Sequence, residues 1–124
     1  LSDRTRFKKA AKALVKDLKQ IKSDKVFRSV YERVAYLYIE FMASTSGTNF
    51  AELLGVTGRF LSEFDESAYK WRVSYLRGIS LVNGIDYKQG KKHLNSLLSN
   101  KDVPEDIRDL ARSELSSLEL SNNL

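Results

Sequence analysis

Hydrophobic residues recur every three or four positions along most of the chain, which is the spacing that places them on one side of an α-helix. Residues 3–22 show such a stripe with lysines on the opposite side, and they predict an amphipathic helix that Ser2 can cap. Between Ser23 and Met42 the apolar positions nearly encircle the helix. That pattern predicts a central helix, buried on most of its sides.

Further helical segments follow, each bounded by a start or stop signal. Turn-forming residues at 44–48 come before the third segment, and Asn83-Gly84 is a strong stop signal after the fourth. Asp86 and Pro104 are typical residues at the starts of the last two. These segments cover residues 49–64, 65–82, 86–99 and 104–120. No alternating stretch predicts a strand, so the chain is expected to be all-α with about six helices.

A pattern of bulky and small residues occurs three times along the chain. The units begin at Tyr31, Tyr69 and Ile107, so they are separated by 38 residues in both cases. A smaller residue four positions after each of these lets a second helix cross closely. Helical hairpins with one apolar face bury it by stacking on one another, so the repeat predicts a short α-solenoid of stacked antiparallel hairpins.

The predicted organisation is a single domain that spans residues 1–124. Its parts are a basic amphipathic helix (1–22), a first hairpin (23–65), a second hairpin (66–101) and a C-terminal capping helix (102–124).

The repeated unit resembles the tetratricopeptide repeat. The first-helix signature of that family is matched by Tyr31, Val34, Ala35 and Tyr38. Gly84 resembles the turn glycine of the family, and Pro104 lies near its closing proline. The second helix of the family is resembled at Tyr87, Gly90 and Leu94. The period is longer than the family's roughly 34 residues, and Arg72 and Glu114 stand where the family has leucine and an aromatic residue.

The length, the charge layout and the ending "IRDLARSELSSLEL" further resemble one branch of such proteins, the ancillary subunit of the bacterial Sec translocon. That resemblance implies a domain carried on the periplasmic side of the inner membrane by a preceding membrane helix, with the cytoplasm as the alternative location. The chain begins with Leu rather than Met, which is typical of a fragment or a processed form. The implied role is a scaffold or a chaperone-like accessory of the cell envelope.

Composition is that of a soluble globular domain, with 42% hydrophobic and 30% charged residues. The net charge of +5 is concentrated in residues 1–22, which carry +6, whereas residues 23–124 carry −1. The basic face of the first helix consists of Lys8, Lys12, Lys16 and Lys19. It is either a solvated face or a contact with an anionic membrane surface or nucleic acid. Nucleic acid is the less favoured partner, because the body of the chain is nearly neutral.

The resemblance also implies which residues line a binding groove, because the first helix of each hairpin faces the concave side in that family. The expected groove residues are Glu32, Tyr36, Lys70, Ser74, Arg77, Arg108 and Arg112. Their four cations suit an acidic peptide segment or a terminal carboxylate, and the alternative is a solvated polar face.

Arg72 projects from an apolar arc, so it is expected to pair with a carboxylate or, as the alternative, to contact a ligand. The candidate partners are Glu32, Glu40 and Glu63. The neighbouring Trp71 and Tyr75 are expected to pack against the adjacent hairpin.

Candidate chemistry is sparse. His93 is the sole histidine and the chain has no cysteine, so we expect neither a metal site, a cofactor nor a nucleophile–base pair. Residues 84–92 differ from a phosphate-binding loop, because five residues separate the glycines and Lys92 replaces the serine or threonine. The sequence therefore predicts a protein–protein interaction module that binds a protein segment, not an enzyme.

Overall fold

A computed structural model of the protein describes residues 3–19 and 25–122. Its helices are α1 (Asp3–Lys19), α2 (Lys25–Ser44), α3 (Phe50–Glu63), α4 (Lys70–Ser80), α5 (Tyr87–Ser99) and α6 (Glu105–Asn122). A short turn segment, η1 (Leu81–Ile85), follows α4 directly. The described part of the chain contains no strand, so the prediction of an all-α protein with about six helices is confirmed.

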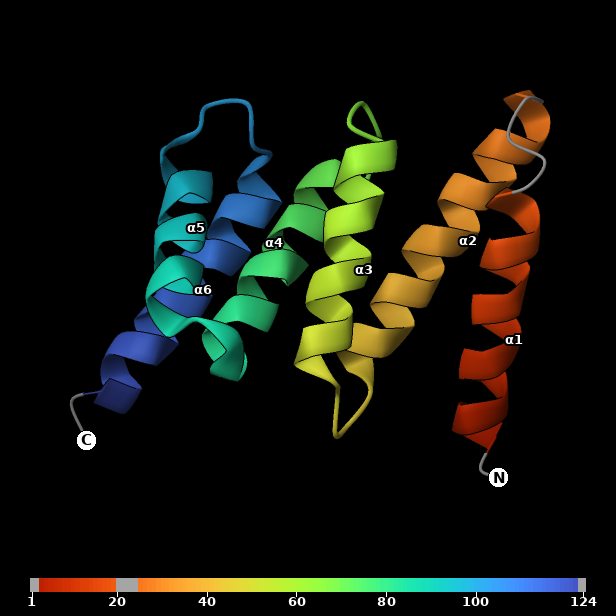
Figure 1. The fold of residues 1–124 in the computed structure, drawn as a ribbon. Coiled ribbons are helices and arrows are strands. Elements are labelled where there is room, and N and C mark those ends of the chain that lie inside the picture. Colours follow the sequence, from red (N-terminus) through yellow and green to blue (C-terminus); the bar gives the residue numbers. More distant parts are fainter. Residues whose placement is uncertain (1–2, 20–24, 123–124) are drawn as a thin grey trace.

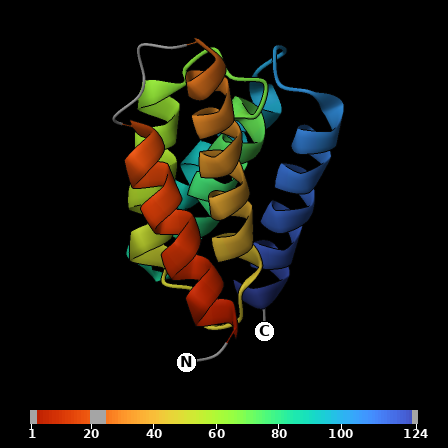
Figure 2. The same cartoon turned by 90° about the vertical axis from the view of Figure 1, so that its right-hand side faces the viewer.

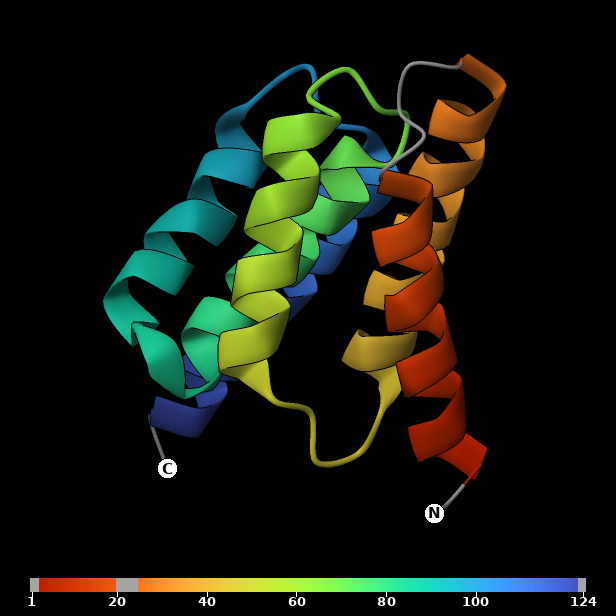
Figure 3. The same cartoon turned by 45° about the vertical axis from the view of Figure 1, so that its right-hand side comes forward.

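Consecutive helices run in opposite directions, and each packs against the next (Figure 1). Helices α1, α3 and α5 form one layer, and α2, α4 and α6 form a second layer behind it (Figures 2 and 3). Within the second layer, α4 contacts both α2 and α6. This arrangement brings together three helices that are not consecutive in the chain.

Local signals set several helix ends, of which those at Gly84, Asp86 and Pro104 were predicted. The side chain of Asn49 accepts a hydrogen bond (3.0 Å) from a backbone amide in the first turn of α3. Asp86 does the same at α5 (3.1 Å), and Pro104 directly precedes α6. Gly84 has a φ of 116°, a conformation that favours glycine, which confirms the stop signal there.

The fourth helix begins later than predicted. Residues 65–69 form turns, and α4 starts at Lys70. The hydroxyl of Ser67 accepts a hydrogen bond (3.1 Å) from the amide of Tyr69, two residues further on. Such local hydrogen bonding by a serine side chain competes with helix formation, which explains the delayed start. At its other end the helical backbone continues from α4 through Leu81 to Val82, as predicted, and the non-helical φ and ψ of Asn83 and Gly84 end it there.

The core consists of two adjoining groups of buried residues. The first joins α2, α3 and α4 and contains Tyr31, Ala35, Tyr38, Ile39, Met42, Leu53, Phe60, Phe64, Val73 and Leu76. The second joins η1, α5 and α6 and contains Val82, Leu94, Leu97, Val103, Ile107 and Ala111. Tyr75 packs against both groups and Trp71 against the second, as expected of these two aromatic residues. The bulky and small positions of the repeated pattern therefore supply much of the core.

Helix α2 is less buried than its sequence predicts. Its buried residues face α3 and α4, whereas Val26 is 70% exposed and Leu37 is 49% exposed. The neighbouring helix on the outer side, α1, leaves a shallow apolar groove open between itself and α2. The prediction that this helix is buried on most sides is wrong, because no described helix covers the rest of its outer surface.

Helix α5 approaches the end of α4 and η1 most closely at two glycines. A Cβ atom added to Gly90 would lie 2.7 Å from the backbone nitrogen of Val82. One added to Gly78 would lie 2.7 Å from Cδ2 of Leu94. Both glycines are buried, so their missing side chains set the distance between these helices.

Candidate functional site

The second layer contains a hollow of about 380 Å³ between α2, α4 and α6. Its apolar lining consists of Ala43, Phe50, Leu53, Leu76, Ile79 and Leu110. Its polar lining consists of Glu40, Ser44, Arg72, Tyr75 and Glu114. A mostly apolar concave surface with a few charged groups is the usual composition of a recognition site.

Arg72 enters this hollow and pairs with Glu40, one of its three candidate partners. The guanidinium Nε lies 2.9 Å from Oε1 of Glu40, and Nη2 lies 3.5 Å from Oε2. Burial acts to lower the pKa of Arg72, but the hydrogen bond and charge of Glu40 outweigh burial and raise it. The pair links α4 to α2 on one side of the hollow, so the expected structural pairing of Arg72 is confirmed.

An aromatic pair lies beside this ion pair. Tyr36 of α2 stacks on Tyr69, which precedes α4, with ring centroids 4.0 Å apart and planes inclined by 8°. Burial and then the charge of Glu40 raise the pKa of Tyr36. The guanidinium of Arg72 also lies 5.6 Å from the ring centroid of Tyr75. The stacked tyrosines and the ion pair thus join α2 to α4 and to the residue before it.

Two of the expected groove residues lie on another side of α4. The hydroxyl of Ser74 is 3.1 Å from Nε2 of His93 on α5, and the side chain of Ser74 is buried. Arg77 donates a hydrogen bond (3.0 Å) to the carbonyl oxygen of Leu54 on α3 and packs over Gly58. These two side chains therefore connect α4 to the first layer rather than lining the hollow.

The remaining expected groove residues are spread over the surface. Lys70 lies over the ring of Trp71, 4.8 Å from its centroid, and Glu32 is half-buried on α2. On α6, Arg108 is 3.5 Å from Glu105, and Arg112 is 2.7 Å from its own partner, Asp109. The structure does not bring the four cations together on one face.

The sequence pattern did not predict three of the lining residues, Ile79, Leu110 and Glu114. Leu110 and Glu114 are one turn apart on α6 and lie on the same side of that helix. The available signal was the acidic residue itself, because Glu114 stands in the repeat where the resembled family has an aromatic side chain. A charged residue at a packing position often marks a partly open surface.

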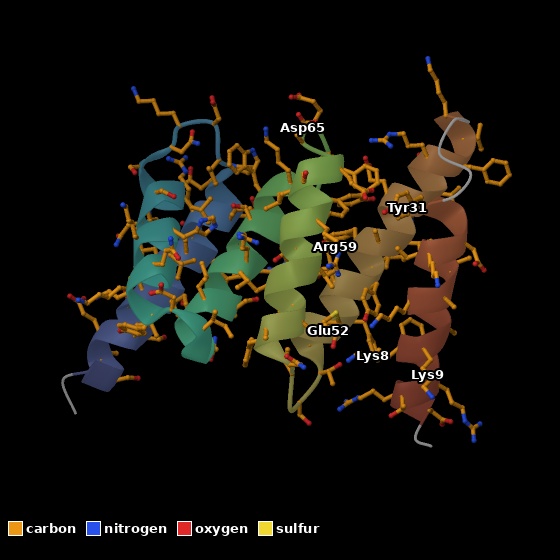
Figure 4. All side chains as sticks on the ribbon, in the orientation of Figure 1. Lys8, Lys9, Tyr31, Glu52, Arg59 and Asp65 are labelled. Atoms are coloured by element: carbon orange, nitrogen blue, oxygen red, sulfur yellow. The ribbon has the colours of Figure 1, made fainter. Side chains whose placement is uncertain are left out.

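The basic face of α1 is directed partly at α3. Nζ of Lys8 is 3.0 Å from Oε2 of Glu52, and Nζ of Lys12 is 3.6 Å from Oε1 of the same carboxylate (Figure 4). The hydrogen bond from Lys8 lowers the pKa of Glu52. Lys16 is exposed, and the side chain of Lys19 lies outside the described residues. At least half of the predicted basic face therefore serves to attach α1 to the body of the domain.

A second cavity, of about 160 Å³, lies between α1 and the hairpin of α2 and α3, where Figure 4 labels Tyr31, Glu52 and Arg59. The hydroxyl of Tyr31 donates to Glu63 (2.7 Å), and that of Tyr38 donates to Glu52 (3.2 Å). Burial, together with Glu52, raises the pKa of Tyr38 to about 12. Because these hydroxyls and carboxylates are already hydrogen-bonded, we assign this cavity to the packing of α1.

Within residues 3–19 and 25–122, histidine and acidic side chains form no cluster that could hold a metal ion. Nε2 of His93 is 2.8 Å from the carbonyl oxygen of Ser74, so this histidine helps to join α5 to α4. No helix in the described ranges is long and apolar enough to cross a membrane.

Comparisons with protein-family models, with curated proteins and with solved structures return no match to this chain.

Proposed function

We propose that the protein is a binding module that holds a segment of another protein in the hollow between α2, α4 and α6. The observation that carries this proposal is the lining of the hollow, which is open, mostly apolar and built from side chains of four helices. Leu53 and Leu76 are buried beneath the hollow, whereas Ile79 and Leu110 are partly exposed in it. Apolar surface left accessible in this way is typical of a contact with a partner. Its polar groups lie beside the apolar ones, which is where groups that orient a bound segment are needed.

The proposal includes a finer architecture, a short α-solenoid of tetratricopeptide type. Three observations support it: the two helical layers, the buried positions of the repeat, and the tight approach of α5 at Gly90. Stacked helical hairpins present an extended concave surface, and such surfaces bind protein segments. In this chain the layer of α2, α4 and α6 is the proposed binding layer.

The proposed setting is the bacterial cell envelope, where the module acts as a scaffold or a chaperone-like accessory on the periplasmic side of the inner membrane. This part of the proposal rests on the resemblance of the repeat, the charge layout and the C-terminal stretch. The sequence of the parent gene tests it. A hydrophobic helix encoded directly before residue 1 supports the envelope setting, and a second soluble domain there contradicts it.

The binding function is tested by comparing peptide binding to the wild-type protein with binding to a variant whose hollow is filled. Peptides are selected from a random decapeptide display library against the wild-type protein and measured by fluorescence anisotropy. Ala43→Trp fills the hollow from α2, whereas Ala13→Trp places the same side chain on the exposed surface of α1. We expect the first variant to lose binding and the second to retain it, with both still helical by circular dichroism. Equal binding by both variants contradicts the proposed site.

A second candidate function is contact with an anionic membrane surface through α1. Phe7 (51%) and Leu14 (46%) are exposed along the groove between α1 and α2, and Arg6, Lys9 and Lys16 are exposed on the same helix. Exposed apolar side chains next to cations are typical of interfacial helices. We expect salt-sensitive binding to phosphatidylglycerol vesicles that Phe7→Ser with Leu14→Ser abolishes. Equal binding to neutral vesicles, or salt-sensitive binding to DNA alone, contradicts this candidate.

A further inference from the structure

The charges that line the hollow do not cancel. Glu40 and Arg72 neutralise each other across the α2–α4 contact, with Nε 2.9 Å from Oε1. The third charged lining residue is Glu114 of α6. No ion pair of Glu114 occurs among the described side chains, so the hollow carries one uncompensated carboxylate.

The cations of α6 do not neutralise this carboxylate. Arg112 lies 2.7 Å from Asp109, and Arg108 lies 3.5 Å from Glu105, so both arginines pair with acids on their own helix. On α4, Arg77 donates a hydrogen bond to the carbonyl oxygen of Leu54, and Lys70 lies over the ring of Trp71. The lining of the hollow therefore lacks Lys70, Arg77, Arg108 and Arg112, and Arg72 is the one positive residue in it within the described ranges.

Glu114 lies in partly buried surroundings, where its charge acts strongly on neighbouring groups. Glu114 is half-buried, and its side chain faces the hollow beside Tyr75. Burial and then the negative charge of Glu114 raise the pKa of the Tyr75 phenol. A carboxylate that has lost part of its water and has no counter-ion gains most from a cation brought by a ligand.

Apolar contacts lie within one helical turn of this charge. Leu110 precedes Glu114 by one turn on the same side of α6 and is 36% exposed. Ile79 of α4 lines the same hollow and is half-buried. A segment with a basic and an apolar side chain close together can thus satisfy both parts of the surface.

We propose that the hollow selects a basic segment, in which a lysine or arginine pairs with Glu114 and a neighbouring apolar side chain packs against Leu110 and Ile79. The inference rests on the proposed function of the hollow and specifies the chemistry of its partner. It replaces the acidic partner suggested by the four cations of the sequence. Charge complementarity of this kind determines which partner binds as well as how fast it binds.

A charge reversal at Glu114 tests the inference. Two parallel selections from the same random decapeptide library use the wild-type protein and Glu114→Lys, and Glu119→Lys serves as the matched control. Glu119 is on the same helix and is exposed, but it does not line the hollow. We expect lysine and arginine to be enriched in peptides selected by the wild type and by the control. Aspartate and glutamate are expected to be enriched by Glu114→Lys.

Affinities of one matched peptide pair complete the test. A wild-type-selected peptide should bind Glu114→Lys about tenfold more weakly, and replacing its basic residue by glutamate should restore binding to that variant. One contrary result is that the selected peptides lose binding to Ala43→Trp and yet show no preference for basic or acidic residues. That result overturns this inference and leaves the proposed function standing. Selected peptides that are all insensitive to Ala43→Trp overturn both.

Discussion

Replacing Gly90 by alanine perturbs the closest contact between α5 and η1. The new Cβ would lie 2.7 Å from the backbone nitrogen of Val82 and 2.9 Å from Cβ of Leu81. Non-bonded carbon atoms normally rest about 3.5–4.0 Å apart. Because one obstructing atom belongs to the backbone, no rotamer change can make room, and α5 must move away by roughly 1 Å.

The expected cost follows from two opposing effects. Overpacking of this kind costs about 1–3 kcal/mol, and the higher helix propensity of alanine returns about 0.5–1 kcal/mol. At the centre of these ranges we expect Gly90→Ala to lower the free energy of unfolding by about 1 kcal/mol. The matched control is Gly55→Ala in α3, where the nearest atom to the new Cβ is the flexible Nη1 of Arg59 at 3.8 Å. That variant should raise the free energy of unfolding by about 0.5–1 kcal/mol.

Urea unfolding followed by circular dichroism measures both variants. The difference between them should be roughly 2 kcal/mol, with Gly90→Ala the less stable. If Gly90→Ala is as stable as the wild type or more stable, the close approach of α5 and η1 is not a feature of the protein.

Three further predictions follow from the polar contacts. A double-mutant cycle of Glu40→Ala and Arg72→Ala should give a coupling of about 0.5–1 kcal/mol, because the pair is about one-third exposed; zero coupling would rule out a direct pair. The pKa of Glu52 is lowered in the folded state, so its contribution to stability is complete above the usual carboxyl range and is lost as the pH falls from roughly 5 to 3. Glu52→Gln should flatten the dependence of melting temperature on pH there, and an unchanged slope would contradict the contact with Lys8. The pKa of Tyr38 is raised to about 12, so stability should fall as the pH rises from about 10 towards that value. In a titration followed by tyrosinate absorbance, Tyr38→Phe should lack one group that ionises above the usual tyrosine pKa. If the high-pH part of the titration is unchanged, Tyr38 is exposed to solvent, which contradicts the structure.

The helices were predictable because their apolar spacing is strong and their caps are local. Asn83-Gly84 and Pro104 each act within a few residues, so their effect does not depend on the rest of the fold. The late start of α4 was not predictable from the acids at 65–66, because the local hydrogen bond of Ser67 competes with the helix.

The candidate site was less predictable, because it depends on which side of α4 the first layer covers. Lys70, Ser74 and Arg77 were expected to line one groove, but α5 and α3 pack against the last two. The side of α4 that faces the hollow includes the apolar Ile79, which the pattern of hydrophobic residues cannot distinguish from the core. Arg72 was recognised because a partly buried charge requires a partner. The choice of Glu40 follows from the packing of α2 against α4.

The most direct test of the account is the mapping of a bound peptide onto the protein by amide chemical shifts. A wild-type-selected peptide is added to the ¹⁵N-labelled protein, and the perturbed backbone amides are assigned. The proposed function predicts that the perturbed amides cluster around the hollow, at Ser44 of α2, Ile79 of α4, and Leu110 and Glu114 of α6. Perturbations confined to α1, α3 or α5, with the amides of α4 and α6 unchanged, would contradict the assignment of the hollow as the binding site.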